Sequence, residues 1–546
     1  MSTDIVAENA RTDGRTPWAD IRLSGHGNLW AAGFVRRVSY NVGETARFSM
    51  STPWSTEVRI YRCGWYGGDG FRLVDTITNT VVSQVEAATI PNSNGATTCT
   101  GWTVTAEWAI PADACSGMYL AVAFLDGAPA FYVGTFVVRD DAAVVDVIYK
   151  TSDSTWAAAY NHYGTPSDTA GRNVYGAGTG VGNIMERSFA VDYHRPVITR
   201  GTVPQTYWFA CEMPLIRFLE RNGYSMKYIS CVDLDQEGVG ILAGKGDVFI
   251  SSGHDEYWTL PMRRAVESFR DEHAGRSIFM SGNEVFWKAR YVYDGDRATL
   301  WCYKDTMPGP NGFSRSAGAV LDPVEWTGTW KDTRWPDREP EWLLTGTDFR
   351  MNGINDEDAV IVRNPYAGIK TWGGSSLVDG DITLVDAIGF EADSIRPTQP
   401  SSSVRVLAAY TRNINGKYAD DNGQNYTGNG NLTWGIVAQR YAGGGVTVGF
   451  GTCQWAWTLD GTHDRGSTTV SLAAQQFTVN LLRDLGADPA TVMPGVTLQA
   501  VNSLDEYGLE PSDAPPVVTT SRFYTHGGAP LFPFLLTSGG LTPLNT

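Results

Sequence analysis

The chain has 546 residues, enough for about three or four domains of ordinary size. Hydrophobic residues make up 42% of it and charged residues only 18%, so the chain can bury large cores and does not have the composition of a disordered protein. A formal net charge of −17 disfavours a general affinity for nucleic acid or for an anionic membrane.

Residues 1–20 are polar and lack the apolar core of a signal peptide, and we expect them to form an N-terminal arm. No stretch approaches the roughly 18 consecutive apolar residues that a membrane span needs. The seven cysteines include no C-x-x-C pair and fit neither a disulfide scaffold nor a zinc site. These features predict a soluble, cytoplasmic, globular protein.

Residues 21–140 show short strands separated by turn residues. In Glu57–Tyr61, for example, polar and apolar residues alternate, and Gly, Asn and Pro separate such runs from one another. This alternation, without any helical segment, predicts an antiparallel β-sandwich of immunoglobulin-like size.

The pattern changes after residue 140, where strands and helices begin to alternate. A buried strand is predicted at Val144–Tyr149, a helix at Pro214–Asn222 and another strand at Ser277–Met280. Alternation at these lengths is typical of a parallel α/β sheet with right-handed crossovers. We therefore predict an α/β domain at residues 141–498.

Two segments interrupt or follow this domain. Residues from about 285 to 400 are rich in Trp, Gly and Pro and have weak periodicity, so we interpret them as a long insertion over the sheet. Strands resume at Val404–Tyr410, and a helix at about Ala473–Leu485 closes the unit. Residues 499–546 are expected to form a C-terminal extension.

Two polar loops follow neighbouring predicted strands. In residues 246–258 an apolar strand leads into a Gly-containing loop with His254, Asp255 and Glu256, and a similar pattern recurs in residues 277–284. In a βαβ unit both loops lie at the carboxyl ends of parallel strands, where open sheets bind ligands. The two loops together favour a functional site, although either carboxylate of the first loop could instead cap the next helix.

A third group of residues, which follows the strand at Val144–Tyr149, contains Tyr160, Tyr163 and Tyr175. Such aromatic residues ordinarily pack in a core or form the wall of a substrate pocket. The sequence has no G-x-S-x-G, H-E-x-x-H or P-loop motif, and no cysteine is expected in a strand-to-helix elbow. A thiol nucleophile is therefore not predicted.

These segments and several others resemble one family. The residues that carry the resemblance are Val58-Arg-Ile-Tyr-Arg62-Cys-Gly-Trp-Tyr66-Gly-Gly, Ala159-Tyr160-Asn161, Val174-Tyr175, Gly253-His-Asp-Glu256-Tyr, Ser281-Gly-Asn283-Glu, Cys302-Tyr-Lys304, Gly389-Phe-Glu391-Ala-Asp393 and Gln454-Trp455. Their order and spacing over roughly residues 20–490 are similar to the large, catalytic subunit of bacterial N,N-dimethylformamidase. That enzyme has a larger N-terminal portion, whereas here we expect only the predicted sandwich to precede the catalytic domain.

The resemblance implies an amidohydrolase with one iron ion held by two tyrosinates and one glutamate. The implied ligands are Tyr160, Tyr175 and Glu256, with Tyr163 as the alternative to the first. Phenolate and carboxylate oxygens are hard anionic donors, which suit iron as Fe(III) acting as a Lewis acid. Three protein ligands would leave positions for water and for the amide oxygen.

Four further residues are implied to act on the substrate or around it: His254, Asn283, Lys304 and Glu391. His254 or Glu391 would carry the proton to the leaving amine. Asn283 and Lys304 would stabilise the developing oxyanion.

The fold expected from these observations is an α/β Rossmann-like, glutamine-amidotransferase-like parallel sheet as the catalytic domain, preceded by the immunoglobulin-like β-sandwich. The expected substrate is a small N-substituted amide or formamide. A homo-oligomer and a separate small subunit are further expectations from the resemblance, and no nucleic acid or membrane partner is expected.

Two other functions remain open from the residues alone. The 19 tryptophans and the predicted sandwich are common in carbohydrate-binding or carbohydrate-active proteins, in which Glu256 and Glu284 could form a carboxylate pair. The chain could also be an amidotransferase-like scaffold without catalysis. Metal content distinguishes the amidohydrolase from both alternatives.

Overall fold

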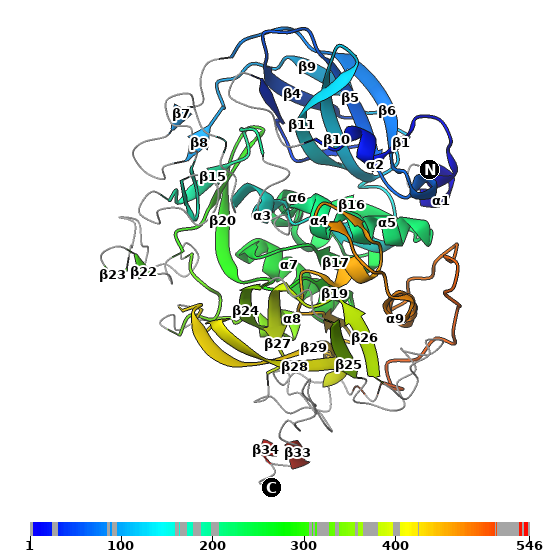
Figure 1. Cartoon of the computed structure of the whole chain (residues 1–546), viewed down its shortest axis with the longest axis vertical. Helices are drawn as coiled ribbons and strands as arrows, with labels where there is room; N and C mark the ends of the chain where they lie inside the picture. The colour runs from blue at the N-terminus through cyan, green and yellow to red at the C-terminus, as the bar shows by residue number, and fades with distance from the viewer. Residues whose placement is uncertain are drawn as a thin grey trace.

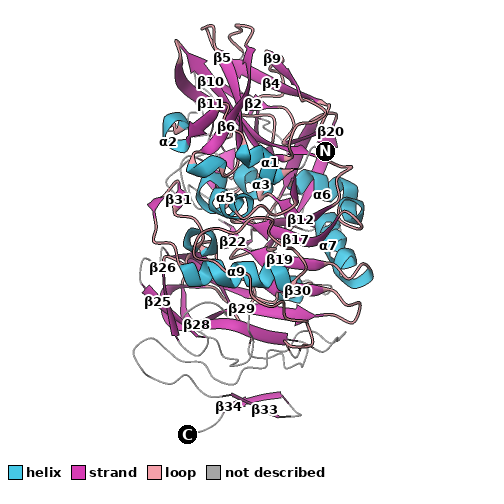
Figure 2. Cartoon of the chain, turned by 90° about the vertical axis from the view of Figure 1, so that its right-hand side faces the viewer, coloured by secondary structure: helices cyan, strands magenta, loops and turns pink. Residues whose placement is uncertain are grey.

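Strands outnumber helices in the part of the chain that the structure, a computed structural model, describes (Figures 1 and 2). The described residues are 4–23, 31–84, 88–89, 96–158, 163, 172–177, 187–197, 207–304, 308–309, 312–313, 327–333, 338–354, 359–363, 381–396, 404–423, 425–507, 509, 534–537 and 540–543. None of the helices among these residues has the length and apolarity needed to span a bilayer.

The N-terminal part contains two sheets that enclose an apolar core. The larger sheet has the strand order β1 (Arg15–Pro17), β6 (Gly70–Thr78), β5 (Glu57–Cys63), β10 (Gly117–Leu125), β11 (Ala128–Arg139) and β3 (Ser39–Asn41). The smaller sheet has the order β2 (Ala32–Val35), β4 (Thr45–Ser51) and β9 (Ala106–Ala109). The pairs are antiparallel except that β3 runs parallel to β11.

Strand β10 is apolar on both faces because each face packs in a different hydrophobic core. Tyr119 and Ala121 pack in the core between the two N-terminal sheets. Leu120 and Val122 belong to a second core, which they share with helical residues such as Phe218. Since successive strand residues point to opposite sides, one strand joins the N-terminal sheets to the rest of the molecule.

An eleven-stranded mixed sheet forms the centre of the remaining chain. Its parallel part is β16 (Met226–Ile229), β12 (Val145–Lys150), β17 (Gly246–Ser252), β19 (Arg276–Met280) and β30 (Val446–Gly449). Its antiparallel part is β29 (Gly428–Arg440), β28 (Val404–Tyr418), β24 (Asp348–Ile354), β27 (Phe390–Ser394), β25 (Ala359–Arg363) and β26 (Asp381–Val385).

The predicted fold class, a Rossmann-like, glutamine-amidotransferase-like parallel α/β domain behind a sandwich, is wrong. The molecule is β-rich, and its central sheet is mixed. A short apolar run such as Val404–Tyr410 does not reveal strand direction, which depends on how strands are connected. Here β28 pairs with β29 as an antiparallel hairpin, and β24–β27, which lie in the predicted insertion, extend the sheet at that side. The predicted domain limits stay a prediction.

Helices and short strands complete the structure, and in Figure 2 several helices lie beside the parallel strands. The helices are α1 (Ile5–Ala10), α2 (Trp18–Ile21), α3 (Asp153–Ala158), α4 (Trp208–Cys211), α5 (Met213–Arg221), α6 (Cys231–Glu237), α7 (Leu260–Glu272), α8 (Trp342–Thr345) and α9 (Leu472–Asp484). The shorter pairs and sheets are β7 (Ala88–Thr89) with β8 (Thr97–Thr98), β13 (Arg172–Asn173) with β14 (Gly176–Ala177), β15 (Ala190–Asp192) with β21 (Arg297–Trp301), β20 (Trp287–Asp294) and β18 (Tyr257–Thr259), β22 (Pro308–Gly309) with β23 (Gly312–Phe313), β31 (Thr462–His463) with β32 (Gly466–Ser467), and β33 (Phe534–Thr537) with β34 (Gly540–Pro543).

Candidate functional site

The loop at residues 253–256 follows β17 at the carboxyl end of the parallel strands. Gly253 begins it with φ +90°, and a Cβ atom at that position would lie 2.6 Å from the Glu212 side chain. The position therefore requires glycine for both backbone conformation and space. The loop then presents His254 and Glu256, which are both buried.

Glu256 accepts hydrogen bonds from two side chains that come from different parts of the chain. The Tyr175 hydroxyl, on the turn between β13 and β14, lies 3.2 Å from each carboxylate oxygen of Glu256. The Asn283 amide donates to the same carboxylate at 3.3 Å. Asn283 belongs to the loop after β19, so the two predicted polar loops do meet.

Glu391 of β27 completes the group from the antiparallel part of the sheet. Its carboxylate lies 2.6 Å from His254 Nε2 and accepts a hydrogen bond from the Asn283 amide at 2.7 Å. His254 Nε2 is also 3.9 Å from Glu256 Oε1. The site therefore lies where β27, of the antiparallel part, meets the loops at the carboxyl ends of β17 and β19.

Lys304 lies beside this group in an aromatic enclosure. Its ammonium nitrogen is 3.7 Å from the ring centroid of Trp287, 4.1 Å from that of Tyr175 and 4.8 Å from that of Tyr257. Lys304 is fully buried, and its nitrogen makes no hydrogen bond to any described residue. Cation–π contacts thus take the place of hydrogen-bond acceptors around this charge.

Burial and neighbouring charges shift the pKa values of the site in opposite directions. Burial lowers the pKa of Lys304 to about 8 against the attraction of Glu256. Burial also disfavours charge on His254, but the carboxylates of Glu391 and Glu256 outweigh it and raise the pKa of the imidazole to about 9. Burial raises the pKa of Glu256, although His254 and Lys304 oppose the rise.

Two residues of the site have backbone conformations that side chains disfavour. Asn283 has φ +54° and Lys304 has φ +50°. Left-handed backbone at a non-glycine residue costs on the order of 1 kcal/mol or more and is concentrated at functional sites.

The side chains of His254, Glu256 and Glu391 can hold a metal ion, since one donor atom of each lies within 4.8 Å of the others. Tyr175 adds a phenol oxygen through its contact with Glu256. Oxygen and imidazole donors suit a hard or intermediate cation such as iron. His254 Nδ1 and Asn283 Oδ1 are buried and have no hydrogen-bond partner among the described residues, so both still have free bonding capacity.

Of the ligands predicted from the sequence, Tyr175 and Glu256 are in direct contact, whereas Tyr160 lies outside the described residues. The alternative ligand Tyr163 is buried in a separate apolar cluster, where its ring meets that of Trp102 edge to face at 6.5 Å. Asn283 and Glu391, which were predicted to act on the substrate, adjoin the pair. The sequence did not indicate the aromatic enclosure of Lys304.

The two glutamates of the proposed glycoside pair lie in different surroundings. Glu256 shares its site with His254, Lys304 and Glu391. Burial raises the pKa of Glu284 well above its usual value, Asp255 adds to the rise, and Ser251 and Lys150 oppose it.

The structure corrects one prediction about thiol chemistry, because Cys231 does lie in a strand-to-helix elbow. It follows β16 directly and begins α6 behind the capping box formed by Ser230 and Asp233. That S-x-x-D spacing is the sequence signal that could have located it. The thiol is fully buried, and burial raises its pKa well above the usual value, so it remains unsuited to nucleophilic attack.

A buried group of carboxylates, an imidazole and a lysine, in which the pKa values of Glu256, His254 and Lys304 are shifted, is typical of an enzyme site. The sequence model of the family described as "N,N-dimethylformamidase beta subunit-like, C-terminal" matches residues 57–468, which is most of the chain. The chain therefore belongs to this family, which supports a hydrolase-type function in general. The match concerns a beta subunit-like domain and does not by itself assign the chain to the large subunit. No curated protein matches the chain.

Proposed function

We propose that this protein is an amidohydrolase that uses one bound iron ion and water to cleave the C–N bond of a small N-substituted amide or formamide. The observation that carries the proposal is the contact of the Tyr175 hydroxyl with both oxygens of Glu256, beside His254, Asn283 and Glu391. The family membership supports the same class of reaction.

Tyr175 and Glu256 would hold the ion together with Tyr160, and their hard oxygen donors fit iron in the ferric state. A bound ferric ion supplies Lewis acidity, which polarises an amide carbonyl and lowers the pKa of a water molecule. The fit rests on the phenol–carboxylate pair, in which Glu256 is buried and Tyr175 is partly buried.

The leaving amine must receive a proton, and His254 is suited to provide it. Glu391 fixes the ring through a 2.6 Å contact to Nε2, and its carboxylate favours the protonated imidazole by raising the pKa of His254. The same carboxylate can receive the proton that the attacking water loses. These two side chains would therefore act as an acid–base pair.

Negative charge that develops on the oxygen of the substrate amide is stabilised best by a hydrogen-bond donor that is already positioned. The Lys304 ammonium has no hydrogen-bond acceptor among the described residues, so binding such an oxygen would not require it to give up an existing bond. The Asn283 amide donates to the carboxylates of Glu256 and Glu391, so it would have to exchange one of these bonds to bind the oxygen as well. Donors fixed in advance in a dry site stabilise an oxyanion more than mobile ones do.

The surroundings favour a small substrate. Aromatic rings border the polar group: Phe390 meets the His254 ring edge to face at 5.6 Å, and Trp287 and Tyr257 flank Lys304. We further propose that the chain acts as the large subunit in an oligomer, with or without a small subunit, because the family description refers to a subunit.

Metal analysis and a visible absorption spectrum of the freshly purified protein test the proposal first. About one iron ion per chain with a broad phenolate-to-iron band is expected, followed by amine release from N-substituted formamides. Glu256→Gln should lose the iron and the activity together. Absence of iron and of the band after reconstitution, or full activity in Glu256→Gln, would refute it.

A further inference from the structure

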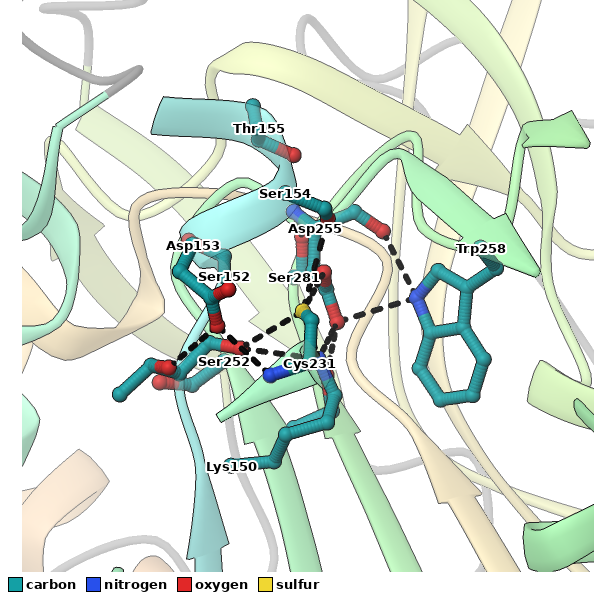
Figure 3. A network of polar contacts seen from close by, with 12 residues as sticks. Lys150, Ser152, Asp153, Ser154, Thr155, Cys231, Ser252, Asp255, Trp258 and Ser281 are labelled. Atoms are coloured by element: carbon teal, nitrogen blue, oxygen red, sulfur yellow. Dashed lines mark hydrogen bonds and ion pairs between the residues drawn. The ribbon is translucent and has the colours of Figure 1, made fainter. Parts of the chain in front are cut away.

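A buried ion pair lies directly behind the candidate site. The Lys150 ammonium is 2.5 Å from Asp255 Oδ2, and both side chains are fully buried (Figure 3). Asp255 Oδ2 also accepts hydrogen bonds from the hydroxyl of Ser251 at 2.5 Å and from the indole nitrogen of Trp258 at 3.0 Å. This carboxylate therefore has three donors around one oxygen.

Asp255 stands between two site residues in the chain, and its side chain points away from them. His254 Nε2 and Glu256 Oε1 approach each other to 3.9 Å, while Asp255 binds Lys150. The three residues belong to the loop between β17 and β18. Because they are consecutive in the chain, holding the Asp255 side chain restricts the backbone that carries His254 and Glu256.

The backbone of the loop at residues 253–256 also forms hydrogen bonds with the segments that carry other site residues. The N–H of Asp255 donates to the Ser281 hydroxyl at 3.2 Å, and Ser281 lies two residues before Asn283. The N–H of Glu256 donates to the Thr155 hydroxyl at 3.2 Å. Thr155 is in α3, and the sequence leads from there to the predicted ligand Tyr160.

Lys150 extends the connection to the start of α3. Its ammonium donates to the Thr151 carbonyl at 3.0 Å and lies 3.3 Å from the Cys231 sulfur. Asp153, at the first position of α3, accepts hydrogen bonds from the Thr151 hydroxyl at 2.8 Å and from the backbone N–H of Cys231 at 2.6 Å. The carboxyl ends of β12, β16 and β17 are thus joined by one polar network.

A buried ion pair contributes little to the free energy of folding, because the loss of hydration offsets the attraction between the charges. Well-packed apolar side chains of similar size would stabilise the core as well or better. Charges and directional hydrogen bonds, however, specify one orientation of the loop, which apolar contacts do not.

We propose that Lys150 and Asp255 form a positioning pair that sets the direction of His254 and Glu256 and thereby the affinity of the site for iron. The inference rests on the proposed function and extends it to residues that would not touch the metal or the substrate. Residues that orient metal ligands typically change metal affinity by about 10- to 100-fold when they are replaced.

The test compares iron retention in Lys150→Met and Asp255→Asn with that of the wild-type protein. Each purified protein is equilibrated with a series of EDTA concentrations, and the remaining iron is measured from its visible band and by metal analysis. The EDTA concentration that removes half of the iron should fall by about 10- to 100-fold in both variants. The position of the band should also shift, since the carboxylate ligand is held differently.

The matched control is Glu220→Gln, which breaks another fully buried ion pair, that with Arg62, away from the site. It should lower the unfolding temperature and leave the EDTA midpoint unchanged. If the Lys150 variant does not fold, Ser251→Ala removes only one hydrogen bond from Asp255 and should still lower the midpoint several-fold.

Three outcomes distinguish a failure of the positioning pair from a failure of the proposed function. A lower EDTA midpoint in the pair variants but not in the control supports the positioning pair. Wild-type protein that holds iron, together with pair variants that hold it equally well, overturns this inference alone. Wild-type protein that binds no iron overturns the proposed function and this inference together.

Discussion

The candidate site depends on single side chains that are held from several directions. Glu256 binds Tyr175 and Asn283, and Glu391 binds His254 and Asn283, so Asn283 joins the two carboxylates. Each of these groups is supplied by a different loop or strand. Removal of one of them leaves a buried polar partner unsatisfied, which is why small substitutions here should have large effects.

The first prediction compares two tyrosines. Tyr175→Phe should remove about half of the phenolate-to-iron absorption and weaken iron binding, because it removes one of the two proposed phenolate ligands, the one that contacts Glu256. Tyr163→Phe is the control, since that ring packs in an apolar cluster. Visible spectra at equal iron loading are the measurement. Loss of the band in Tyr163→Phe and not in Tyr175→Phe would show that the wrong tyrosine has been assigned.

At the scale of elements, loops and turns carry most of the ionisable residues of the site, and the strands of the sheet position them. The hairpin of β31 and β32 is an example outside the site. Its residue His463 stacks on Trp457 with ring centroids 4.5 Å apart and an angle of 4° between the rings. His463 is buried, and burial together with Arg465 and Arg22 lowers its pKa to about 3.

The second prediction follows from that lowered pKa. Unfolded chains bind a proton at this histidine below about pH 6.5, whereas the folded protein binds one only near pH 3. This histidine should therefore lower the free energy of unfolding by about 1.4 kcal/mol for each pH unit between about pH 6.5 and about pH 3. His463→Phe keeps the stacking and removes the titration. In urea unfolding the variant should lose about 2 kcal/mol less than the wild type between about pH 7 and about pH 5; equal losses would contradict the assignment.

At the scale of the whole molecule, a buried ion pair and an apolar core connect the N-terminal sheets to the rest. Arg62 of β5 binds Glu220 of α5 through two hydrogen bonds of 2.9 and 2.7 Å, and both side chains are fully buried. Tyr228 of β16 donates to the same carboxylate at 2.7 Å. The motif around Arg62 therefore belongs to a contact between two parts of the molecule and not to the candidate site.

The third prediction concerns this contact. Glu220→Gln leaves the Arg62 guanidinium buried without its counterion and should lower the free energy of unfolding by about 3–5 kcal/mol. Calorimetric unfolding is the measurement. The exposed pair of Arg47 and Glu107 provides the control, and Glu107→Gln should cost about 1 kcal/mol or less. Equal effects of the two substitutions would show that burial of the Arg62 pair has no special consequence.

Local features could be predicted from the sequence because they depend on neighbouring residues. The helix predicted at Pro214–Asn222 is confirmed as α5, Met213–Arg221. The two polar loops that were expected at one sheet edge do bring His254, Glu256 and Asn283 together. Periodicity, glycines and helix caps act over a few residues, so one sequence is enough to recognise them.

Long-range features could not be predicted from the residues alone. Glu391 entered only through the family resemblance, and it reaches His254 because β27 joins the side of the sheet that was expected to be covered by an insertion. The elbow position of Cys231 and the enclosure of Lys304 by three aromatic rings were also missed.

By itself, then, the sequence determined the short elements, the chemical types of the site residues and the family. The tertiary structure decided the direction of the strands, the mixed character of the sheet and the partners of each buried charge. The physical reason is that local patterns follow from steric and hydrogen-bonding preferences within a few residues. Strand order and charge pairing depend instead on how segments far apart in the chain pack and exclude water from one another.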